Sequence, residues 1–195
     1  MVGFLLKVLS SLIILLIILA LSQPTSNQRV VEKIGEGAQI GLVLDRSASM
    51  DDPFSGGENK AGETKSAAAS RLIIDFFESR SNDMVGVVTF SNSAMYVLPL
   101  TQNKEAIKAA VNATAGNALF QTNIGAGLTS SAALFSGVAD SGSRAIILLS
   151  DGAGRIDAST QQKIKDWFDR YEIGLYWIVL RKPGGLSIFD KDLSL

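Results

Sequence analysis

The chain has 195 residues, enough for one globular domain with a sizeable core. Its 18 basic and 19 acidic side chains nearly cancel, so we expect no basic surface for nucleic acid. The absence of cysteine excludes disulfides, thiolate metal sites and cysteine nucleophiles. The absence of histidine excludes Ser-His-Asp hydrolysis and metal sites that depend on imidazole. Any chemistry must therefore use carboxylates, hydroxyls, amines and the backbone.

Residues 1–28 form a leader and linker that differ in composition from the rest of the chain. Lys7 is the only charged side chain there, and residues 8–21 are apolar except for two serines. With the apolar residues before Lys7, the stretch reaches the roughly 20 residues that cross a bilayer. Its length and its Ile and Leu content favour an uncleaved single-pass anchor, with Lys7 at the cytoplasmic face. The alternative is a signal peptide with a small-x-small cleavage site at residues 20–22. Both hypotheses predict that the domain, residues 29–195, lies outside the cytoplasm, either membrane-anchored or secreted or periplasmic.

After the leader, short β-rich runs alternate with longer helical patterns, which is typical of an α/β protein with a mostly parallel sheet. The tight turn that precedes the third strand predicts an antiparallel edge strand. The fourth strand is apolar throughout, as expected for a strand covered on both faces. The expected strands are residues 39–44, 84–90, 94–98, 145–149 and 173–180. The expected helices follow Thr64, Asn103, Thr122, and Asp157 or Ser159. Helical spacing predicts that Trp167, Phe168 and Tyr171 form a buried stripe on the last helix. We also expect Trp177 to be buried in the last strand and a turn at residues 182–185 to end that strand.

Two acidic residues, Asp45 and Asp151, follow predicted buried strands. Ligands of open α/β sheets bind at the edge where such strands end. Asp45 opens the string D-R-S-A-S, so that Ser47 and Ser49 can point the same way as the carboxylate. Thr122, just before a predicted helix, supplies a third hydroxyl. Two carboxylates and three hydroxyls are hard oxygen donors that suit Mg²⁺ or Mn²⁺, whereas Ca²⁺ usually takes more carboxylate and carbonyl donors.

Each of these residues also has a simpler interpretation when taken alone. Asp45 and the two serines that follow it could stabilise the loop or cap the next segment. Thr122 is a good N-cap residue, and Asp151 with the glycine after it is typical of a turn. The occurrence of all five together favours the metal site.

The D-R-S-A-S string, the downstream Thr122 and the S-D-G string at residues 150–152 resemble a von Willebrand factor type A domain with its metal-ion-dependent adhesion site. The resemblance covers residues 38–180. It implies a three-layer Rossmann-like α/β fold, with helices on both faces of the sheet and the metal at its edge. It also implies that Ser47, Ser49 and Thr122 bind the cation directly, and that Asp45 and Asp151 bind it largely through water. The open coordination position would then accept an Asp or Glu side chain from a partner protein.

The chain departs from the family pattern in three places. Residues 119–121, L-F-Q, stand where the family often has glycines before the threonine. The first loop is enlarged by residues 51–64. The last helix and strand of the family domain have no sequence to form them. We therefore expect a domain that is incomplete at its C-terminus, with a fifth strand that forms an exposed edge.

A leader followed directly by such a domain resembles bacterial membrane-anchored members of the family. Some of these work with AAA+ ATPases of the MoxR type in assembling or activating other protein complexes. Residues 45–54 and 175–181 also resemble accessory proteins of bacterial methanol oxidation. The resemblance thus implies a cation-dependent protein-interaction module and not an enzyme.

Two other classes of function compete with this interpretation. A Mg²⁺-dependent phosphatase could use Asp45 as its nucleophile. However, serine at position 47 replaces the second aspartate of a D-x-D motif, and no G-x-x-x-x-G-K loop is present. The other alternative is a structural scaffold with a vestigial metal site, which the complete set of ligands disfavours.

Overall fold

The computed structural model describes residues 2–21, 37–54, 63–115, 121–139, 142–152, 154 and 156–181. The predicted linker, the turn expected at residues 182–185 and the last ten residues of the chain lie outside this part. The chain forms two compact units, Met1–Glu32 and Lys33–Leu195.

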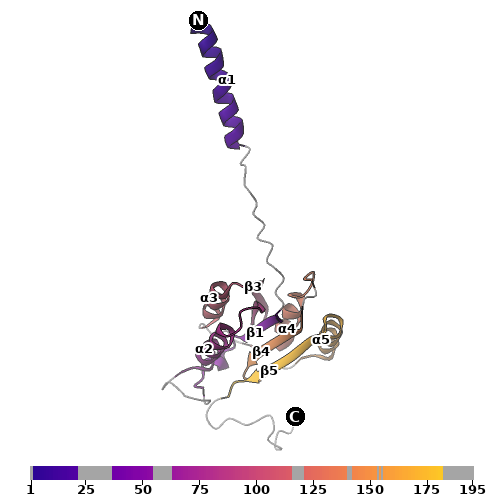
Figure 1. Ribbon diagram of the computed structural model, residues 1–195. Helices are drawn as coiled ribbons and strands as arrows, with labels where there is room; N and C mark the ends of the chain where they lie inside the picture. Colours follow the sequence, from indigo (N-terminus) through magenta and orange to yellow (C-terminus); the bar gives the residue numbers. More distant parts are fainter. Residues whose placement is uncertain are drawn as a thin grey trace, which may run out of the picture. The chain divides into compact units, whose positions relative to one another are not determined.

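The first unit contains helix α1 (Val2–Leu21), drawn in indigo in Figure 1. The side chains of residues 2–17 are exposed along it. Among the described residues, no helix combines the length and the apolar character needed to cross a membrane.

The second unit is built on a five-stranded sheet in the order β3-β2-β1-β4-β5. Strand β1 pairs in parallel with β2 and β4, β4 pairs in parallel with β5, and β3 runs antiparallel to β2. This arrangement confirms the mostly parallel sheet with an antiparallel edge strand. The strands are β1 (Gln39–Asp45), β2 (Met84–Phe90), β3 (Ala94–Thr101), β4 (Arg144–Ser150) and β5 (Ile173–Val179).

Helices cover both faces of the sheet, which confirms the three-layer fold (Figure 1). Alternate residues of a strand point to opposite faces, so Leu42 and Leu44 pack toward α2 and α3 whereas Val43 packs toward α4 and α5. The helices are the 3₁₀ turn η1 (Ala48–Asp51), α2 (Lys65–Glu78), α3 (Lys104–Thr114), α4 (Ile124–Ala133) and α5 (Ala158–Tyr171).

Side-chain caps start the α-helices that the structure describes in this unit. Thr64, Asn103 and Asp157 accept hydrogen bonds from backbone N–H groups in the first turns of α2, α3 and α5, as predicted. At α4 the cap is Asn123, whose side chain accepts from the N–H of Ala126. The interpretation of Thr122 as the N-cap is therefore wrong, because the capping position falls one residue later.

Helix α4 packs unusually close to the sheet. A Cβ placed on Gly127 would lie 2.8 Å from the ring of Phe90 and 3.1 Å from Val43. The absence of a side chain lets the first turn of α4 press against the ends of β1 and β2. This contact fixes the segment that carries Thr122.

The aromatic residues near the end of the chain are less buried than the sequence predicts. Trp177 is 45% exposed and Tyr176 is 63% exposed, because β5 lies at the sheet edge and pairs only with β4 among the described residues. On α5, Ile164 is buried, but Trp167 and Tyr171 of the predicted buried stripe are half-buried. The predicted burial of Trp177 is therefore wrong, whereas the exposed fifth strand is found within the described part of the sheet.

Candidate functional site

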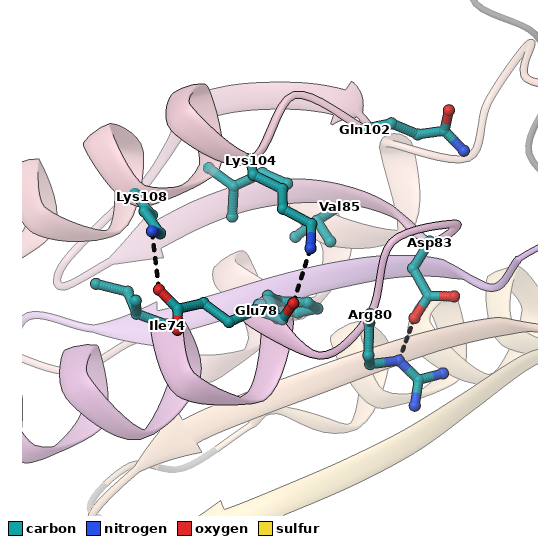
Figure 2. A pocket seen from close by; sticks show the side chains of 10 residues that line it. Ile74, Glu78, Arg80, Asp83, Val85, Gln102, Lys104 and Lys108 are labelled. Atoms are coloured by element: carbon teal, nitrogen blue, oxygen red, sulfur yellow. Dashed lines mark hydrogen bonds and ion pairs between the residues drawn. The ribbon is translucent and has the colours of Figure 1, made fainter.

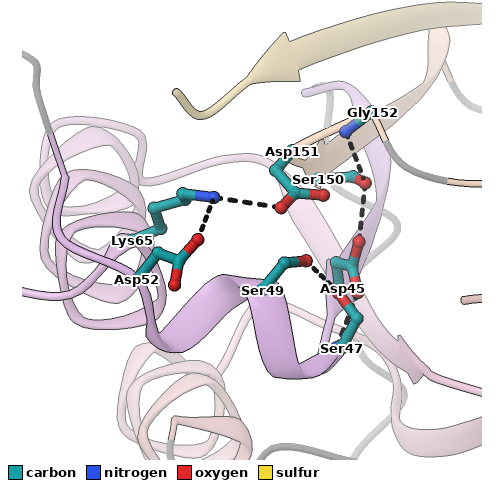
Figure 3. A network of polar contacts seen from close by, with 8 residues as sticks. All are labelled: Asp45, Ser47, Ser49, Asp52, Lys65, Ser150, Asp151 and Gly152. Atoms are coloured by element: carbon teal, nitrogen blue, oxygen red, sulfur yellow. Dashed lines mark hydrogen bonds and ion pairs between the residues drawn. The ribbon is translucent and has the colours of Figure 1, made fainter. Parts of the chain in front are cut away.

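Asp45 forms the centre of a polar network at the edge of the sheet where β1 ends (Figure 3). Its Oδ1 accepts a 2.7 Å hydrogen bond from the N–H of Ser47, and its Oδ2 accepts a 2.6 Å hydrogen bond from the hydroxyl of Ser150. Strands β1 and β4 are parallel neighbours, so their last residues meet at the same edge. The strand order also reverses there, and α/β proteins bind ligands at such points.

Asp45 as a whole is only 4% exposed. Burial raises its pKa above the ordinary value, because desolvation penalises the charged form. Hydrogen bonds from Ser150 and Ser47 act in the opposite direction, and the negative charge of Asp151 raises the pKa further. A buried carboxylate with a second acidic group beside it favours a nearby cation.

Ser150 links this carboxylate to the loop after β4. Its hydroxyl donates to Asp45 and accepts a 3.2 Å hydrogen bond from the N–H of Gly152. Gly152 has φ of +91°, a conformation that glycine adopts without strain. The S-D-G string therefore forms a turn that is tied to Asp45.

The hydroxyls of Ser47 and Ser49 lie 3.1 Å apart, as the alternate spacing of D-R-S-A-S predicts. Ser47 is extended, with φ of −67° and ψ of 155°, and η1 begins at the next residue. This change of backbone brings the two hydroxyls to the same side. Adjacent oxygen ligands of octahedral Mg²⁺ lie about 3 Å apart when each metal–oxygen distance is about 2.1 Å. The separation of the two hydroxyls thus fits two neighbouring coordination positions.

Thr122 lies on a neighbouring loop and is half-buried. The N–H of Asn123 donates to the carbonyl of Ser91 at 2.7 Å, and the N–H of Arg46 donates to the carbonyl of Phe90 at 2.8 Å. Both loops are therefore attached to the end of β2. The methyl group of Thr122 is also 3.4 Å from where a Cβ on Gly154 would lie, which puts it beside the loop that follows Asp151.

The departure from the family pattern before Thr122 has a structural consequence at Gln121. This residue has φ of +79°, in the left-handed region that favours glycine. A glutamine there stores local strain of order 1 kcal/mol or more. Residues 119 and 120 lie outside the described part of the chain.

Asp151 contacts a residue that the sequence analysis did not select, Lys65. The Nζ of Lys65 donates to Oδ2 of Asp151 at 3.0 Å and lies 3.8 Å from Oδ2 of Asp52 (Figure 3). Lys65 is 3% exposed although it is the first residue of α2. The partial positive charge at a helix N-terminus disfavours a cation, so a lysine at this position is the signal that could have indicated an acidic partner.

The donor chemistry of these loops fits a small, hard divalent cation. Asp45, Ser47, Ser49 and Asp151 bring carboxylate and hydroxyl oxygens to one edge of the sheet, and Thr122 lies on the adjacent loop. Within the described part of the chain, no three side chains of the Asp, Glu, His or Cys types gather as a metal site. A cation held here would thus depend on the hydroxyls, and keep more of its Lewis acidity than one surrounded by carboxylates.

A second group of charged residues lies between α2 and α3, at the end of the sheet where β2 begins (Figure 2). Nζ of Lys108 contacts Oε1 of Glu78 at 2.8 Å, and Nζ of Lys104 donates to the Glu78 carbonyl at 2.8 Å. The hydrogen bond from Lys108 and its charge lower the pKa of the Glu78 carboxyl. Arg80 and Asp83 form an ion pair nearby. Cations near the C-terminal end of a helix stabilise it, so these contacts are accounted for by the stability of α2.

Residues 40–153 match the family model of the von Willebrand factor type A domain. The chain belongs to this family. The matched segment is more than half of the chain and contains all the predicted site residues: Asp45, Ser47, Ser49, Thr122 and Asp151. Domains of this family are commonly protein-interaction modules and are mostly not enzymes.

One protein sequence and two solved structures are similar to this chain. A protein of Borreliella burgdorferi, described only as uncharacterized, is 30% identical over 91 residues, which are 47% of this chain and 25% of that protein. The structure of the conserved hypothetical protein BatB from Bacteroides thetaiotaomicron matches with a TM-score of 0.60 at 22% identity, covering 73% of this chain and 66% of that chain. The structure of an aerotolerance-related membrane protein from Bacteroides fragilis, carrying multiple mutations to serine, matches with a TM-score of 0.61 at 22% identity. The match covers 80% of this chain and 75% of that chain. This von Willebrand factor type A chain therefore spans a quarter of its relative from Borreliella burgdorferi, and the two structures support its fold alone.

Proposed function

We propose that this von Willebrand factor type A domain binds a partner protein through a divalent cation, Mg²⁺ or Mn²⁺. The observation that carries the proposal is the pair of hydroxyls on Ser47 and Ser49, 3.1 Å apart beside the buried carboxylate of Asp45. The carboxylate of a residue that is 4% exposed needs positive charge or several hydrogen bonds nearby. The hydroxyl pair supplies neutral oxygen ligands in the same place.

The five residues would bind the cation in two ways, directly and through water. Ser47, Ser49 and Thr122 would contact the cation through their hydroxyls. Asp45 and Asp151 would balance its charge, largely through bound water. A cation held by neutral ligands and only two carboxylates retains the capacity to bind a further carboxylate. The partner is thus expected to present an Asp or Glu side chain.

Calorimetric titration of the full chain in detergent with Mg²⁺ tests this function. We expect saturable binding by the wild type and its loss in Asp45→Ala. The absence of binding by the wild type, or unchanged binding in Asp45→Ala, would reject the metal assignment. Turnover of a phosphomonoester that depends on Mg²⁺ and disappears in Asp45→Asn would instead favour the phosphatase alternative.

We further propose that the leader takes the domain to the membrane and keeps it there, outside the cytoplasm. In the sequence, the apolar residues 8–21 and the single charge at Lys7 support this role. Mass spectrometry of the chain isolated from membranes should find α1 intact. A mature chain that starts at Gln23 would contradict the anchor and support a cleaved signal peptide.

We also propose that the domain helps to assemble or activate another protein complex, together with a MoxR-type AAA+ ATPase. It is supported by the order of leader and domain, and the resemblance to methanol-oxidation accessory proteins suggests one kind of complex. A gene for an AAA+ ATPase next to the gene for this chain would support the role. Its absence from the neighbourhood in several related genomes would argue against it.

A further inference from the structure

We propose that the Lys65 ammonium competes with the divalent cation for Asp151 and so lowers the affinity of the site for metal. This inference rests on the proposed metal-binding function and adds a regulating residue to it. Lys65 would act as a built-in cation that neutralises Asp151 while metal is absent. The domain would then bind its cation weakly and reversibly.

The burial of Lys65 is the first observation behind this inference. Its side chain is 4% exposed, and a lysine ammonium is removed from water only when it is paired. The partner is Asp151, whose side chain is 9% exposed and whose Oδ2 lies 3.0 Å from Nζ. Asp52 is a weaker second partner, since it lies at 3.8 Å and is 46% exposed. The ammonium and the carboxylate thus share a site that is largely closed to solvent.

The backbone fixes where this ammonium can reach. The N–H of Lys65 donates to the carbonyl of Asp52 at 3.0 Å, and Pro53 and Thr64 form an antiparallel bridge. The N–H of Phe54 also donates to the carbonyl of Glu63 at 3.0 Å. The start of α2 is therefore attached to the segment that follows Ser49. The side chain of Lys65 extends from there to Asp151, which is 86 positions away in the sequence.

Local forces do not explain this position. Lys65 begins α2, where the helix dipole disfavours positive charge. The contact with Asp151 must outweigh that cost and the cost of burying the ammonium. The residue is thus held by the candidate metal site itself and not by its own helix.

Competition follows from the charges. Asp151 is one of the two carboxylates available to balance a cation, and its Oδ2 is engaged by Lys65. A divalent cation bound among Asp45, Ser47 and Ser49 would repel the ammonium, and water screens this repulsion poorly in a buried site. Metal binding must therefore loosen the contact between Lys65 and Asp151 or tolerate the repulsion.

Removal of the positive charge tests the inference. We expect Lys65→Met to bind Mg²⁺ about tenfold more tightly than the wild type in a calorimetric titration of the full chain. Lys65→Arg keeps the charge and should resemble the wild type. Lys108→Met removes a lysine paired with Glu78 at the end of the sheet where β2 begins, and it should also leave the affinity unchanged. If Lys65→Met does not fold, Lys65→Gln serves the same purpose, because its amide can still donate to Asp151.

A second measurement compares thermal unfolding of the variants without and with metal. In EDTA, Lys65→Met should unfold at a lower temperature than the wild type, and Mg²⁺ should raise its Tm by more than it raises that of the wild type. A double-mutant cycle of Lys65→Met with Asp151→Asn in EDTA should show a clear coupling between the two residues. A coupling near zero would overturn the inference.

The outcomes separate the two proposals. Wild-type binding of Mg²⁺ with equal or weaker binding by Lys65→Met would overturn the role of Lys65 and leave the metal site standing. Failure of both chains to bind Mg²⁺ would reject the proposed metal function, and with it the competition. Binding by Lys65→Met alone would support the competition and show that Lys65 blocks the site.

Discussion

The hydroxyl of Ser150, at the end of β4, donates a 2.6 Å hydrogen bond to the carboxylate of Asp45, at the end of β1. Ser150 is fully buried and Asp45 is 4% exposed, so the bond lies beneath the surface of the candidate site. It joins the two strands between which the strand order reverses. The orientation of Asp45 is thus set by a residue that is itself not a candidate metal ligand.

Replacement of Ser150 by alanine should therefore destabilise the domain. The buried carboxylate would lose one of its hydrogen bonds, which costs about 1–3 kcal/mol for a charged group. Urea unfolding monitored by circular dichroism measures the change. Ser143→Ala, an exposed serine just before β4, is the control and should change the free energy of unfolding by less than about 0.5 kcal/mol. Equal stability of the two variants would contradict the structural role of Ser150.

A side chain at Gly127 should loosen α4 from the sheet. In Gly127→Ala the new Cβ would lie 2.8 Å from the ring of Phe90, closer than real Cβ contacts allow. Such overpacking costs about 1–3 kcal/mol, more than alanine gains in a helix. Thermal unfolding should show a lower Tm, and Ala126→Ser, at the half-buried neighbouring position, should show little change. A Tm equal to or above that of the wild type would mean that α4 does not press on the sheet as described.

The stability of α5 should depend on pH through Asp157. Hydrogen bonds from Ser159 and Thr160 hold the pKa of the Asp157 carboxyl well below its ordinary value of 3.8. The folded-state pKa is thus lower than the unfolded one, so the stabilisation is present above about pH 4 and is lost as the pH falls through the folded value. Asp157→Asn should therefore lose less stability than the wild type between pH 5 and pH 2.

Urea midpoints measured across this range test the effect of Asp157. Ser159→Ala removes one of the donors, at 2.6 Å, and should give an intermediate dependence on pH. Wild type and Asp157→Asn with the same slope of stability against pH would show that the cap does not titrate as expected.

The exposed edge strand β5 should promote self-association of the chain. Leu175, Tyr176, Trp177 and Ile178 are each more than 40% exposed on it. Charged residues on an edge strand oppose pairing with another chain. Tyr176→Lys should therefore lower the amount of oligomer that light scattering detects at high concentration. Gln161→Lys adds the same charge on α5 and should have no such effect, and an equal effect of both changes would contradict a role for the edge.

The sequence predicts most of the fold because its signals are local. Continuous apolar runs identify the strands, and Thr64, Asn103 and Asp157 identify the starts of helices by their capping chemistry. The D-R-S-A-S spacing also brings Ser47 and Ser49 together within a few residues, and this needs little from the rest of the chain. Local geometry of this kind can be deduced without the tertiary structure.

The features that were missed depend on contacts between distant segments. Lys65 meets Asp151 across 86 positions, and Ser150 meets Asp45 across 105. No spacing rule connects such residues. Trp177 was expected to be buried because it lies in an apolar strand, yet its exposure is decided by which segments lie next to β5. These contacts and this exposure are set by the tertiary structure, including the order of the strands, and not by composition.

Electron paramagnetic resonance of Mn²⁺ added to the full chain tests the central claim most directly, because it counts bound and free cation. We predict one bound Mn²⁺ per chain for the wild type and for Ser136→Ala, which alters an exposed serine after α4. At the same concentrations, Ser49→Ala should leave most of the Mn²⁺ free, since it removes one of the two hydroxyls that lie 3.1 Å apart. Equal binding by Ser49→Ala and the wild type, or free Mn²⁺ in all three samples, would contradict a metal site built on these hydroxyls.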